Sequence, residues 1–292
     1  MNHEVQELTK EWVAKRLPVR PKDANKGTFG KVLVLAGSEN YPGAAYLSCA
    51  ACYRVGAGLV SLATTPSVKI IVSRKLPEVT FLSFEEIFKK LVEYDVLLIG
   101  PGLGQSKQTV KLMKHILNSN LPPTVIDGDG LNLLSKIEKW WERFWTSQND
   151  KAKDIILTPH PGEMARLTGI SVKKIQADRA NVAQYHAKKW NQLIVLKGAN
   201  TVIVSPAGQV LISPFANPAL STAGTGDVLA GAIAGLLAQG LKPADAAGVG
   251  VYVHGLAGER LKENTGKAGM LASDLLPMLP KVLLNISKHR IC

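Results

Sequence analysis

The sequence predicts an α/β protein with a mostly parallel central sheet and helices on both faces of that sheet. Short runs rich in Val, Ile and Leu alternate with longer small-residue or amphipathic segments, a pattern typical of parallel strands joined by covering helices. At least four of these runs end in loops rich in Gly, Pro or Asp, and ligands of open α/β sheets bind where such loops collect. The expected strands are residues 31–36, 59–63, 96–99, 124–126, 155–157, 193–196 and 201–204.

The last part of the sheet is expected to be antiparallel. Residues 201–204 and 210–212 flank a turn around Pro206, Ala207 and Gly208, which predicts a β-hairpin. No internal repeat, low-complexity stretch or linker rich in Pro, Gly or Ser divides the 292 residues. We therefore predict one domain, residues 1–292, built on a mixed sheet.

The composition excludes several classes of protein. With 46% hydrophobic and 20% charged residues the chain can bury a large core, which excludes intrinsic disorder. The longest uninterrupted apolar stretch, residues 228–238, is well short of the roughly 18 residues that span a bilayer. Residues 1–16 are charged and lack the apolar core of a signal peptide. We expect a cytoplasmic protein with no membrane partner.

The three cysteines are expected to be free thiols. So few in so long a chain fit a reducing compartment rather than a disulfide framework. Cys49 and Cys52 form a CxxC pair, but LSCAACYRVGAG is typical of the apolar face of a packed helix, and no second pair completes a zinc site. We therefore predict that Cys49 and Cys52 are core thiols.

The charge balance favours small anionic ligands. The 35 Lys and Arg residues exceed the 23 Asp and Glu residues by 12, which suits an anionic partner. The basic residues are scattered, with no dense arm and no interleaving of aromatic and basic residues. Nucleic acid is therefore not expected as a partner.

The strongest local signal is NPALSTAGTGDVLAG, residues 217–231, in which a glycine-rich turn runs directly into an apolar helix. Glycines in the turn let consecutive N–H groups point outward, and the helix dipole adds positive potential at the same place. The turn is therefore predicted to be an anion hole, made by Ala223, Gly224, Thr225 and Gly226.

Asp227 follows in the first turn of this helix. A carboxylate at that position could simply cap the helix. Two glycines and two threonines are more than a cap requires, however, and no GxxxxGK[ST] phosphate loop occurs in the chain. A carboxylate beside a phosphate site can take the proton of a hydroxyl that attacks phosphorus. We predict that Asp227 is the catalytic base.

Taken in order, the motifs of this sequence resemble those of one family. They are KGTFGK, AGSENYPGAA, RVGAGLV, GPGLG, DGDGLN, LTPHPGEMARL, LKGANTVI and GTGDVLAG, and they extend over nearly the whole chain. GTGD resembles the anion-hole and base motif of the ribokinase-like kinases, and the ordered set is similar to the NAD(P)H-hydrate dehydratases of that superfamily. The resemblance implies a ribokinase-like three-layer sandwich.

The resemblance also implies an activity, the repair of damaged nicotinamide cofactor. In this family the S epimer of hydrated NADH or NADPH is dehydrated at the expense of ADP or ATP. The ring hydroxyl is phosphorylated and phosphate is then eliminated, because phosphate leaves far more readily than hydroxide. Mg²⁺ would bridge the nucleotide phosphates, and relatives assemble as homotetramers. The chain begins about two dozen residues before KGTFGK, so we expect no fused epimerase domain.

Ligand-binding positions follow from the resemblance in the same way. The hydrate is expected on Ala45, Gly104, His160 and Asp227. The nucleotide is expected on Lys197, Gly198, Ala199, Asn200, Thr201 and Gly226. No metal ligand is assigned.

Five polar residues, at or near these ligand-binding positions, each have two interpretations. Lys197, at the end of an apolar strand, can meet a phosphate or a sugar, or merely solubilise the strand end. His160, between two prolines, can project into the crevice to bind substrate or can be a surface residue. Glu163 can cap the following helix, which we favour, or reach a metal-bound water. Asp127 and Asp129 can bind ribose hydroxyls or magnesium, or form a turn.

Two other functions remain open from the sequence. A ribokinase-like kinase of a vitamin-precursor alcohol, of the hydroxymethylpyrimidine or thiazole type, would also use GTGD, although PHPGE, GPGLG and AGSxxxxGAA argue against it. A non-catalytic nucleotide sensor would have no use for Asp227 beside the anion hole. Residues 136–154, with Trp140, Trp141 and Trp145, predict a surface excursion or an oligomer contact.

Overall fold

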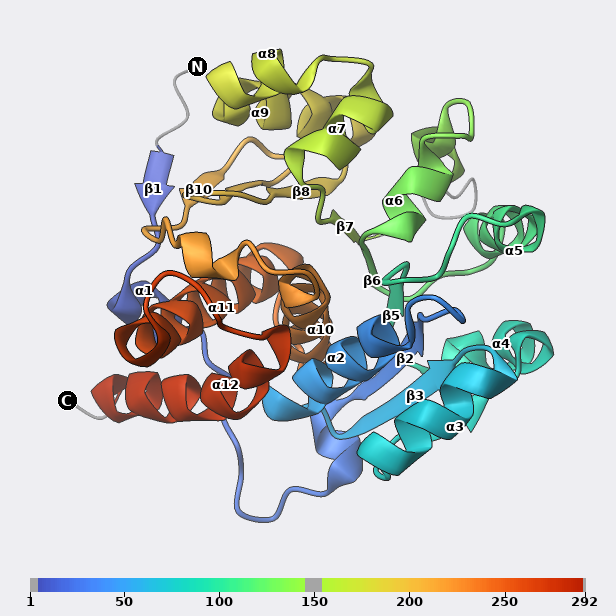
Figure 1. Cartoon of the computed structure of the whole chain (residues 1–292), viewed down its shortest axis with the longest axis horizontal. Helices are drawn as coiled ribbons and strands as arrows, with labels where there is room; N and C mark the ends of the chain where they lie inside the picture. The colour runs from blue at the N-terminus through green and yellow to red at the C-terminus, as the bar shows by residue number, and fades with distance from the viewer. Residues whose placement is uncertain (1–4, 145–153, 291–292) are drawn as a thin grey trace.

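The computed structural model describes residues 5–144 and 154–290, and through them runs a ten-stranded sheet with helices on both faces (Figure 1). The strand order is β1-β10-β9-β8-β7-β6-β5-β2-β3-β4. The strands are β1 (Val5–Glu7), β2 (Lys31–Leu35), β3 (Leu59–Ala63), β4 (Thr80–Leu82), β5 (Val96–Ile99), β6 (Thr124–Ile126), β7 (Ile155–Leu157), β8 (Leu193–Leu196), β9 (Val202–Val204) and β10 (Val210–Ile212).

The sheet is parallel from β4 to β8 and mixed at its other end. β9 is antiparallel to both β8 and β10, and β1 joins β10 as a parallel edge strand. The predicted hairpin and mixed sheet are confirmed. The predicted strands match, except that the first ends at Leu35 and the last begins at Val202. The sequence does not predict the edge strands β1 and β4, because neither is a buried apolar run: β1 (VQE) is exposed throughout and β4 (TFL) is only partly buried.

The helices form one layer on each face of the sheet, as the predicted three-layer sandwich requires. None of the described helices is both long and apolar enough to cross a membrane. The first layer consists of α1 (Lys10–Ala14), α2 (Pro42–Arg54), α3 (Pro66–Lys75), α10 (Thr225–Ala238), α11 (Pro243–Thr265) and α12 (Ala272–Ser287). The second layer consists of α4 (Phe84–Lys90), α5 (Lys107–Leu117), α6 (Asp129–Leu134), α7 (Pro161–Thr168), α8 (Val172–Ala177) and α9 (Arg179–Trp190).

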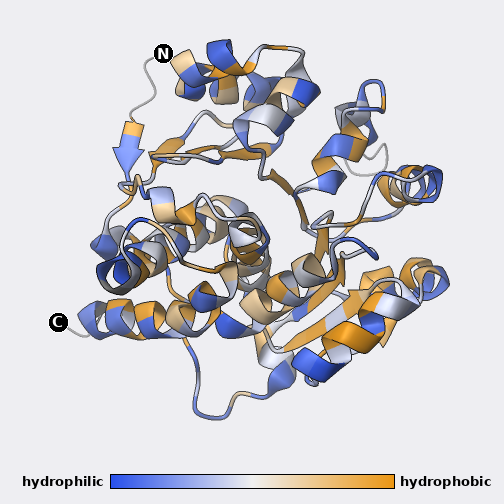
Figure 2. Cartoon of the chain, in the orientation of Figure 1, coloured by the Kyte–Doolittle hydropathy of each residue, from blue (hydrophilic) through white to orange (hydrophobic). Residues whose placement is uncertain are grey.

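Alternate residues of the central strands pack into two separate cores. In β2, Val32 and Val34 face the first helical layer, and Leu33 and Leu35 face the second. All four side chains are fully buried, which is why this strand is a continuous apolar run in the sequence. Figure 2 shows the same contrast between hydrophobic strands and the mixed colours of the covering helices.

Helix α10 packs closely on α2, and this packing fixes the position of the α10 N-terminus. A Cβ atom on Gly231 would lie 2.2 Å from the carbonyl oxygen of Ser48, so the approach requires glycine. The Cys52 thiol donates to the Gly231 carbonyl at 3.2 Å. Burial raises the pKa of both Cys49 and Cys52. The prediction of buried, free thiols at these two positions is confirmed.

The Trp-rich segment is only partly at the surface. Trp140 begins the short 3-10 helix Trp140–Phe144, is 2% exposed, and its ring centroid lies 4.9 Å from that of Trp190 in α9. Phe144 is fully buried. The predicted surface excursion is therefore wrong at Trp140 and Phe144, because Trp190 supplies an apolar partner distant in the sequence. Trp145 lies outside the described residues.

Candidate active site

Three of the predicted loops are joined at the carboxyl ends of β2, β5 and β6. The Gly37 N–H donates to the carbonyl of Pro101 at 2.9 Å, which connects the loops after β2 and β5. The Gly104 N–H donates to Asp129 Oδ2 at 2.8 Å, which connects the loops after β5 and β6. The structure therefore brings these loops together at the edge of the sheet where the sequence predicts the site.

The turn formed by residues 223–226 begins α10 without a side-chain cap. Gly224 is the N-cap residue and has a φ of +92°, a backbone conformation that favours glycine. The Thr225 hydroxyl donates to the carbonyls of Leu220 at 2.8 Å and Thr222 at 2.9 Å and so braces the turn. The first N–H groups of a helix have no acceptor within the helix, and the dipole is positive there. This end of α10 is therefore open to an anion.

His254 of α11 supports the same turn. Its Nε2 atom lies 3.0 Å from the carbonyl oxygen of Thr225, so Nε2 carries the hydrogen and donates it. Burial lowers the pKa of His254 to about 4 and the charge of Lys197 acts in the same direction, which outweighs the bond to Thr225. The ring is therefore neutral at neutral pH. Sequence reasoning missed His254, because one histidine in an apolar helix is no local sign of a site.

Asp227 lies half-buried in the first turn of α10. Burial raises the pKa of its carboxyl group to about 7, the carboxylates of Asp127 and Glu163 add to the rise, and Lys197 opposes it. Among the described residues, none donates a hydrogen bond to this carboxyl group. A carboxyl group with these properties is suited to accept a proton at neutral pH.

The ammonium group of Lys197 is held by Asp127. Lys197 Nζ lies 2.5 Å from Asp127 Oδ1, which also accepts a hydrogen bond from Thr158 Oγ1 at 2.6 Å. Burial acts to lower the pKa of Lys197, but the Asp127 and Glu163 carboxylates outweigh it and raise the pKa, so the lysine stays charged. A Cβ atom on Gly226 would lie 3.4 Å from Nζ, which places this charge beside the turn. Sequence reasoning missed Thr158, although it directly follows a strand.

His160 and Glu163 cap helix α7 reciprocally. His160 Nδ1 accepts from the Gly162 N–H at 2.9 Å, and Glu163 Oε2 accepts from the His160 N–H at 2.8 Å. The favoured interpretation of Glu163 as a cap is confirmed. Burial lowers the pKa of the half-exposed His160 ring and raises the pKa of the Glu163 carboxyl group to about 7. Because Nδ1 is an acceptor, neutral His160 carries its hydrogen on Nε2, which lies 3.4 Å from Glu163 Oε1 and belongs to a half-exposed ring that a ligand can reach.

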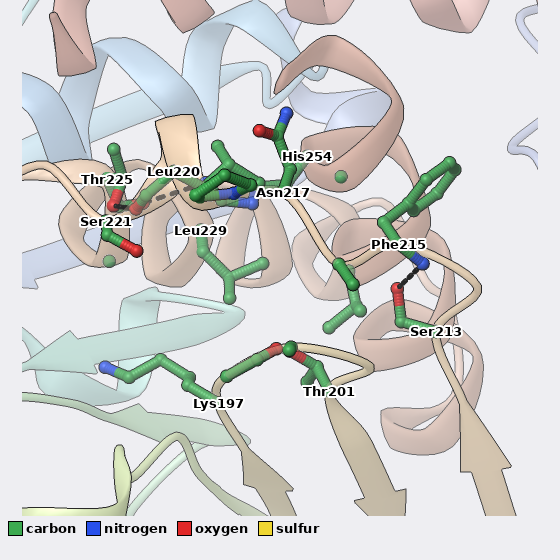
Figure 3. Close-up of a pocket in the computed structure, with 17 residues that line it drawn as sticks. Lys197, Thr201, Ser213, Phe215, Asn217, Leu220, Ser221, Thr225, Leu229 and His254 are labelled. Carbon is green, nitrogen blue, oxygen red and sulfur yellow. Dashed lines mark hydrogen bonds between the residues drawn. The ribbon is translucent and has the colours of Figure 1, made fainter. Parts of the chain in front are cut away.

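A cavity of about 390 Å³ lies between the end of β8 and the N-terminal half of α10. Figure 3 shows Lys197 and Thr201 on one side of this cavity and Thr225 and Leu229 on the other. Its mixture of apolar walls and a few polar groups is typical of small-molecule sites. The residues predicted to bind nucleotide that line this cavity are Lys197, Gly198, Ala199, Thr201 and Gly226.

Asn200 is not among the residues that line the cavity. Its side-chain amide donates to the carbonyl of Ser213 at 3.0 Å, and its own φ is +52°. Asparagine tolerates this left-handed conformation better than most residues. The Asn200 side chain therefore shapes the loop between β8 and β9 rather than facing the cavity.

A second cavity, of about 770 Å³, lies at the carboxyl ends of β2 and β5 and is lined by Gly104, Ser38 and Asp129. Ala45 lines neither cavity. It is fully buried, and its methyl group lies 2.8 Å from where a Cβ atom on Gly37 would be. The structure thus brings Gly104 to an open space but places the Ala45 side chain beneath the loop after β2.

The described carboxylates do not form a complete magnesium site. Residues 5–144 and 154–290 contain no group of three or more His, Cys, Asp or Glu side chains able to hold a metal ion. Asp127 is paired with Lys197, and Asp129 accepts from the Gly104 N–H and from the Gln105 side chain. Mg²⁺ commonly takes several of its ligands from water and substrate phosphates, and no metal ligand of this chain is assigned.

Most of the chain matches proteins of known family. The family model for NAD(P)H-hydrate dehydratase matches residues 32–281. The ADP-dependent (S)-NAD(P)H-hydrate dehydratase of Bacillus subtilis is 35% identical over 280 residues, covering 94% of this chain and 96% of that protein. The bifunctional NAD(P)H-hydrate repair enzyme of Moorella thermoacetica is 42% identical over 295 residues, covering 97% of this chain but 54% of that enzyme. The chain therefore spans about half the length of its bifunctional relatives.

Solved structures agree with these matches. The crystal structure of the ADP/ATP-dependent NAD(P)H-hydrate dehydratase of Bacillus subtilis, co-crystallised with ATP/Mg²⁺, has a TM-score of 0.85 at 33% identity and covers 98% of this chain and 99% of that one. The hydroxyethylthiazole kinase of Pyrococcus horikoshii, with a TM-score of 0.60 and 16% identity over 96% of this chain and 94% of that one, shares the fold alone. The fold is ribokinase-like, as predicted, and the chain belongs to the NAD(P)H-hydrate dehydratase family.

Proposed function

We propose that this chain uses ADP or ATP to dehydrate the S epimer of hydrated NADH or NADPH and so returns the coenzyme to its working form. The observation that carries the proposal is the Asp227 carboxyl group, which has a pKa of about 7 and stands in the first turn of an uncapped helix. The names of the Bacillus and Moorella relatives support the substrate.

The first chemical step is phosphoryl transfer to the ring hydroxyl of the hydrate. Asp227 accepts the hydroxyl proton, and the oxygen attacks the terminal phosphorus of the nucleotide. A new P–O bond forms as the bond to the departing nucleotide breaks. The N–H groups of residues 223–226 offset the negative charge on the phosphoryl group in transfer.

The second step is elimination. The C–O bond breaks and its electrons leave with phosphate, while the ring nitrogen stabilises the positive charge that develops on the carbon. A proton is then lost from the neighbouring carbon, which restores the ring double bond. With ATP, the sum is hydrate and ATP giving coenzyme, ADP, inorganic phosphate and a proton.

The two cavities provide room for the two ligands. The nucleotide occupies the cavity of about 390 Å³ between β8 and α10, with Mg²⁺ on its phosphates. The hydrate places its ring between Asp227 and the N–H donor of His160, and the rest of the dinucleotide extends past Gly104. We further expect one domain over residues 1–292, a homotetramer, a cytoplasmic location and no nucleic-acid partner.

The test of this function is optical. The protein is mixed with authentic S hydrate, Mg²⁺ and either ADP or ATP in separate cuvettes, and the near-ultraviolet absorbance of the dihydronicotinamide is followed. A nucleotide-dependent rise is expected and identifies the preferred phosphoryl donor. No rise with either nucleotide would reject the dehydratase function, and a stable phosphorylated alcohol would favour a kinase instead.

A further inference from the structure

We propose that Asp127 and Thr158 are positioning residues that hold the Lys197 ammonium group at the anion hole, where Lys197 acts on the phosphoryl group in transfer. The inference rests on the proposed function and adds to it. It makes Lys197 a catalytic cation rather than a contact to the sugar of the nucleotide. It also gives Asp127 a role other than a turn residue or a magnesium ligand.

The three residues come from the same edge of three neighbouring strands. Asp127 follows β6, Thr158 follows β7 and Lys197 follows β8, and these strands are adjacent and parallel in the sheet. Side chains that emerge side by side from a rigid sheet are held more accurately than side chains of a free loop. The rigid strand ends therefore fix the backbone positions from which the Thr158, Asp127 and Lys197 side chains contact one another.

Burial fixes the Lys197 side chain further. The Lys197 side chain is 16% exposed and the Asp127 side chain 3% exposed, so water does not screen their ion pair effectively. Lysine is a flexible side chain with a compact charge, and it loses much of its freedom when such a pair holds it. Buried ion pairs contribute little net stability in general, so positional control is the better physical reason for this one.

The position of Nζ points to the transferred group. The Nζ atom lies 3.4 Å from where a Cβ atom on Gly226 would be, and it is near enough to Asp227 to oppose the rise in its pKa. The second carboxylate near Nζ, Glu163 Oε2, is 3.8 Å away and already caps α7. Asp127 is therefore the group that sets where the charge of Lys197 lies.

The experiment compares Asp127→Asn and Thr158→Val with the matched control Thr124→Val. Thr124 is also fully buried beside the sheet end, but it begins β6 at the opposite edge and its hydroxyl donates to the Pro122 carbonyl at 2.7 Å. For each variant the kcat and the nucleotide KM of hydrate repair, the nucleotide Kd and the Tm are measured. Thr158→Ser, which restores the hydroxyl, serves as the rescue.

A positioning role predicts a loss in kcat. We expect Asp127→Asn to lower kcat by at least about tenfold while the nucleotide KM and Kd change by less than about threefold. Thr158→Val should lower kcat less, Thr158→Ser should restore it, and Thr124→Val should lower only the Tm. Because the Asp127 charge raises the pKa of Asp227, Asp127→Asn should also move the acid limb of the kcat profile to lower pH.

The results distinguish failure of this inference from failure of the proposed function. If the wild-type protein repairs no hydrate with either nucleotide, the proposed function itself fails. If the wild type is active and Asp127→Asn keeps its kcat, or loses activity only through KM, the positioning role is wrong. If Asp127→Asn does not fold, equal kcat values for Thr158→Val and Thr124→Val would overturn the inference.

Discussion

The Nε2 atom of His254, in helix α11, lies 3.0 Å from the carbonyl oxygen of Thr225 in the first turn of α10. This hydrogen bond connects two helices at the turn on which the anion hole depends. His254 also lines the cavity assigned to the nucleotide. The imidazole therefore acts as a fixed, neutral donor that holds the backbone of the turn in place.

Replacing His254 with Phe keeps a flat ring but removes the donor. We expect turnover to fall about tenfold and nucleotide affinity to weaken, because small misplacements of a transition-state site are costly. Steady-state kinetics with a nucleotide titration checks this. The control is His115→Phe, since His115 is an exposed residue of α5 whose ring stacks on Phe88. Equal effects of the two substitutions would contradict a role for His254 at the turn.

Asp227→Asn should abolish repair and leave nucleotide binding intact. Removing a general base typically costs about 10²–10⁴ in rate, whereas the N–H groups of the turn do not depend on the carboxylate. Turnover and calorimetric nucleotide affinity are the measurements. A variant with wild-type turnover would remove Asp227 from the mechanism.

The raised pKa of Asp227 also predicts how turnover depends on pH. Its pKa is raised to about 7, chiefly by burial, and only the deprotonated form accepts a proton. We therefore expect kcat to fall as the pH drops below about 7 and to level off above it. A profile of kcat from acid to mildly alkaline pH checks this, and a kcat that stays level well below pH 7 would be inconsistent with this base.

The buried His186 ring makes the stability of the protein depend on pH. The residue is 5% exposed, neither ring nitrogen has a partner among the described residues, and burial lowers its pKa to about 4. An unfolded chain binds the proton near pH 6.5, so the stability given by neutral His186 is present above about pH 6.5 and is lost as the pH falls towards 4.

His186→Phe should therefore make the Tm less sensitive to acid between about pH 6.5 and 4. The ring packs against Trp190 at a centroid distance of 4.6 Å, and an apolar ring suits that contact. Thermal unfolding at several pH values measures the effect, with the exposed His115→Phe as the control. A variant that loses Tm on acidification as steeply as the wild type would contradict it.

Gly231→Ala tests the close packing of α10 on α2. The added Cβ atom would lie 2.2 Å from the Ser48 carbonyl oxygen, and overpacking of a core typically costs about 1–3 kcal/mol. We expect a lower Tm and a lower free energy of unfolding in denaturant titrations. Gly43→Ala, a helical position with nothing within 4 Å of the new Cβ atom, is the control and should not be destabilised. Equal stability of the two variants would disprove the packing argument.

The sequence predicts the parallel part of the sheet because that part is encoded locally. Strands such as β2 are buried on both faces and therefore appear as continuous apolar runs between glycine-rich loops. The turn at Gly224 and the base at Asp227 are likewise predictable, since a turn, a helix start and a carboxylate are contiguous in the chain. Local sequence patterns of this kind are sufficient to predict the fold class and the location of the site.

Partners that are distant in the chain are not encoded in this way. The pairing of Asp127 with Lys197 joins residues 70 positions apart, and the bond from His254 to Thr225 joins residues 29 positions apart. Each member has an ordinary local interpretation, as a turn aspartate, a strand-end lysine or a core histidine. The packing of Trp140 on Trp190 is hidden for the same reason, which is why the sequence misplaces Trp140 at the surface.

Coupled repair of the hydrate and hydrolysis of the nucleotide is tested by measuring absorbance and phosphate in one reaction. Wild-type protein and Asp227→Asn are each given S hydrate, Mg²⁺ and the preferred nucleotide, and the near-ultraviolet absorbance and inorganic phosphate are followed together. We expect one phosphate to be released for each reduced coenzyme restored, and only with the wild-type protein. Restoration without phosphate release, or a phosphorylated hydrate that accumulates without any rise in absorbance, would contradict it.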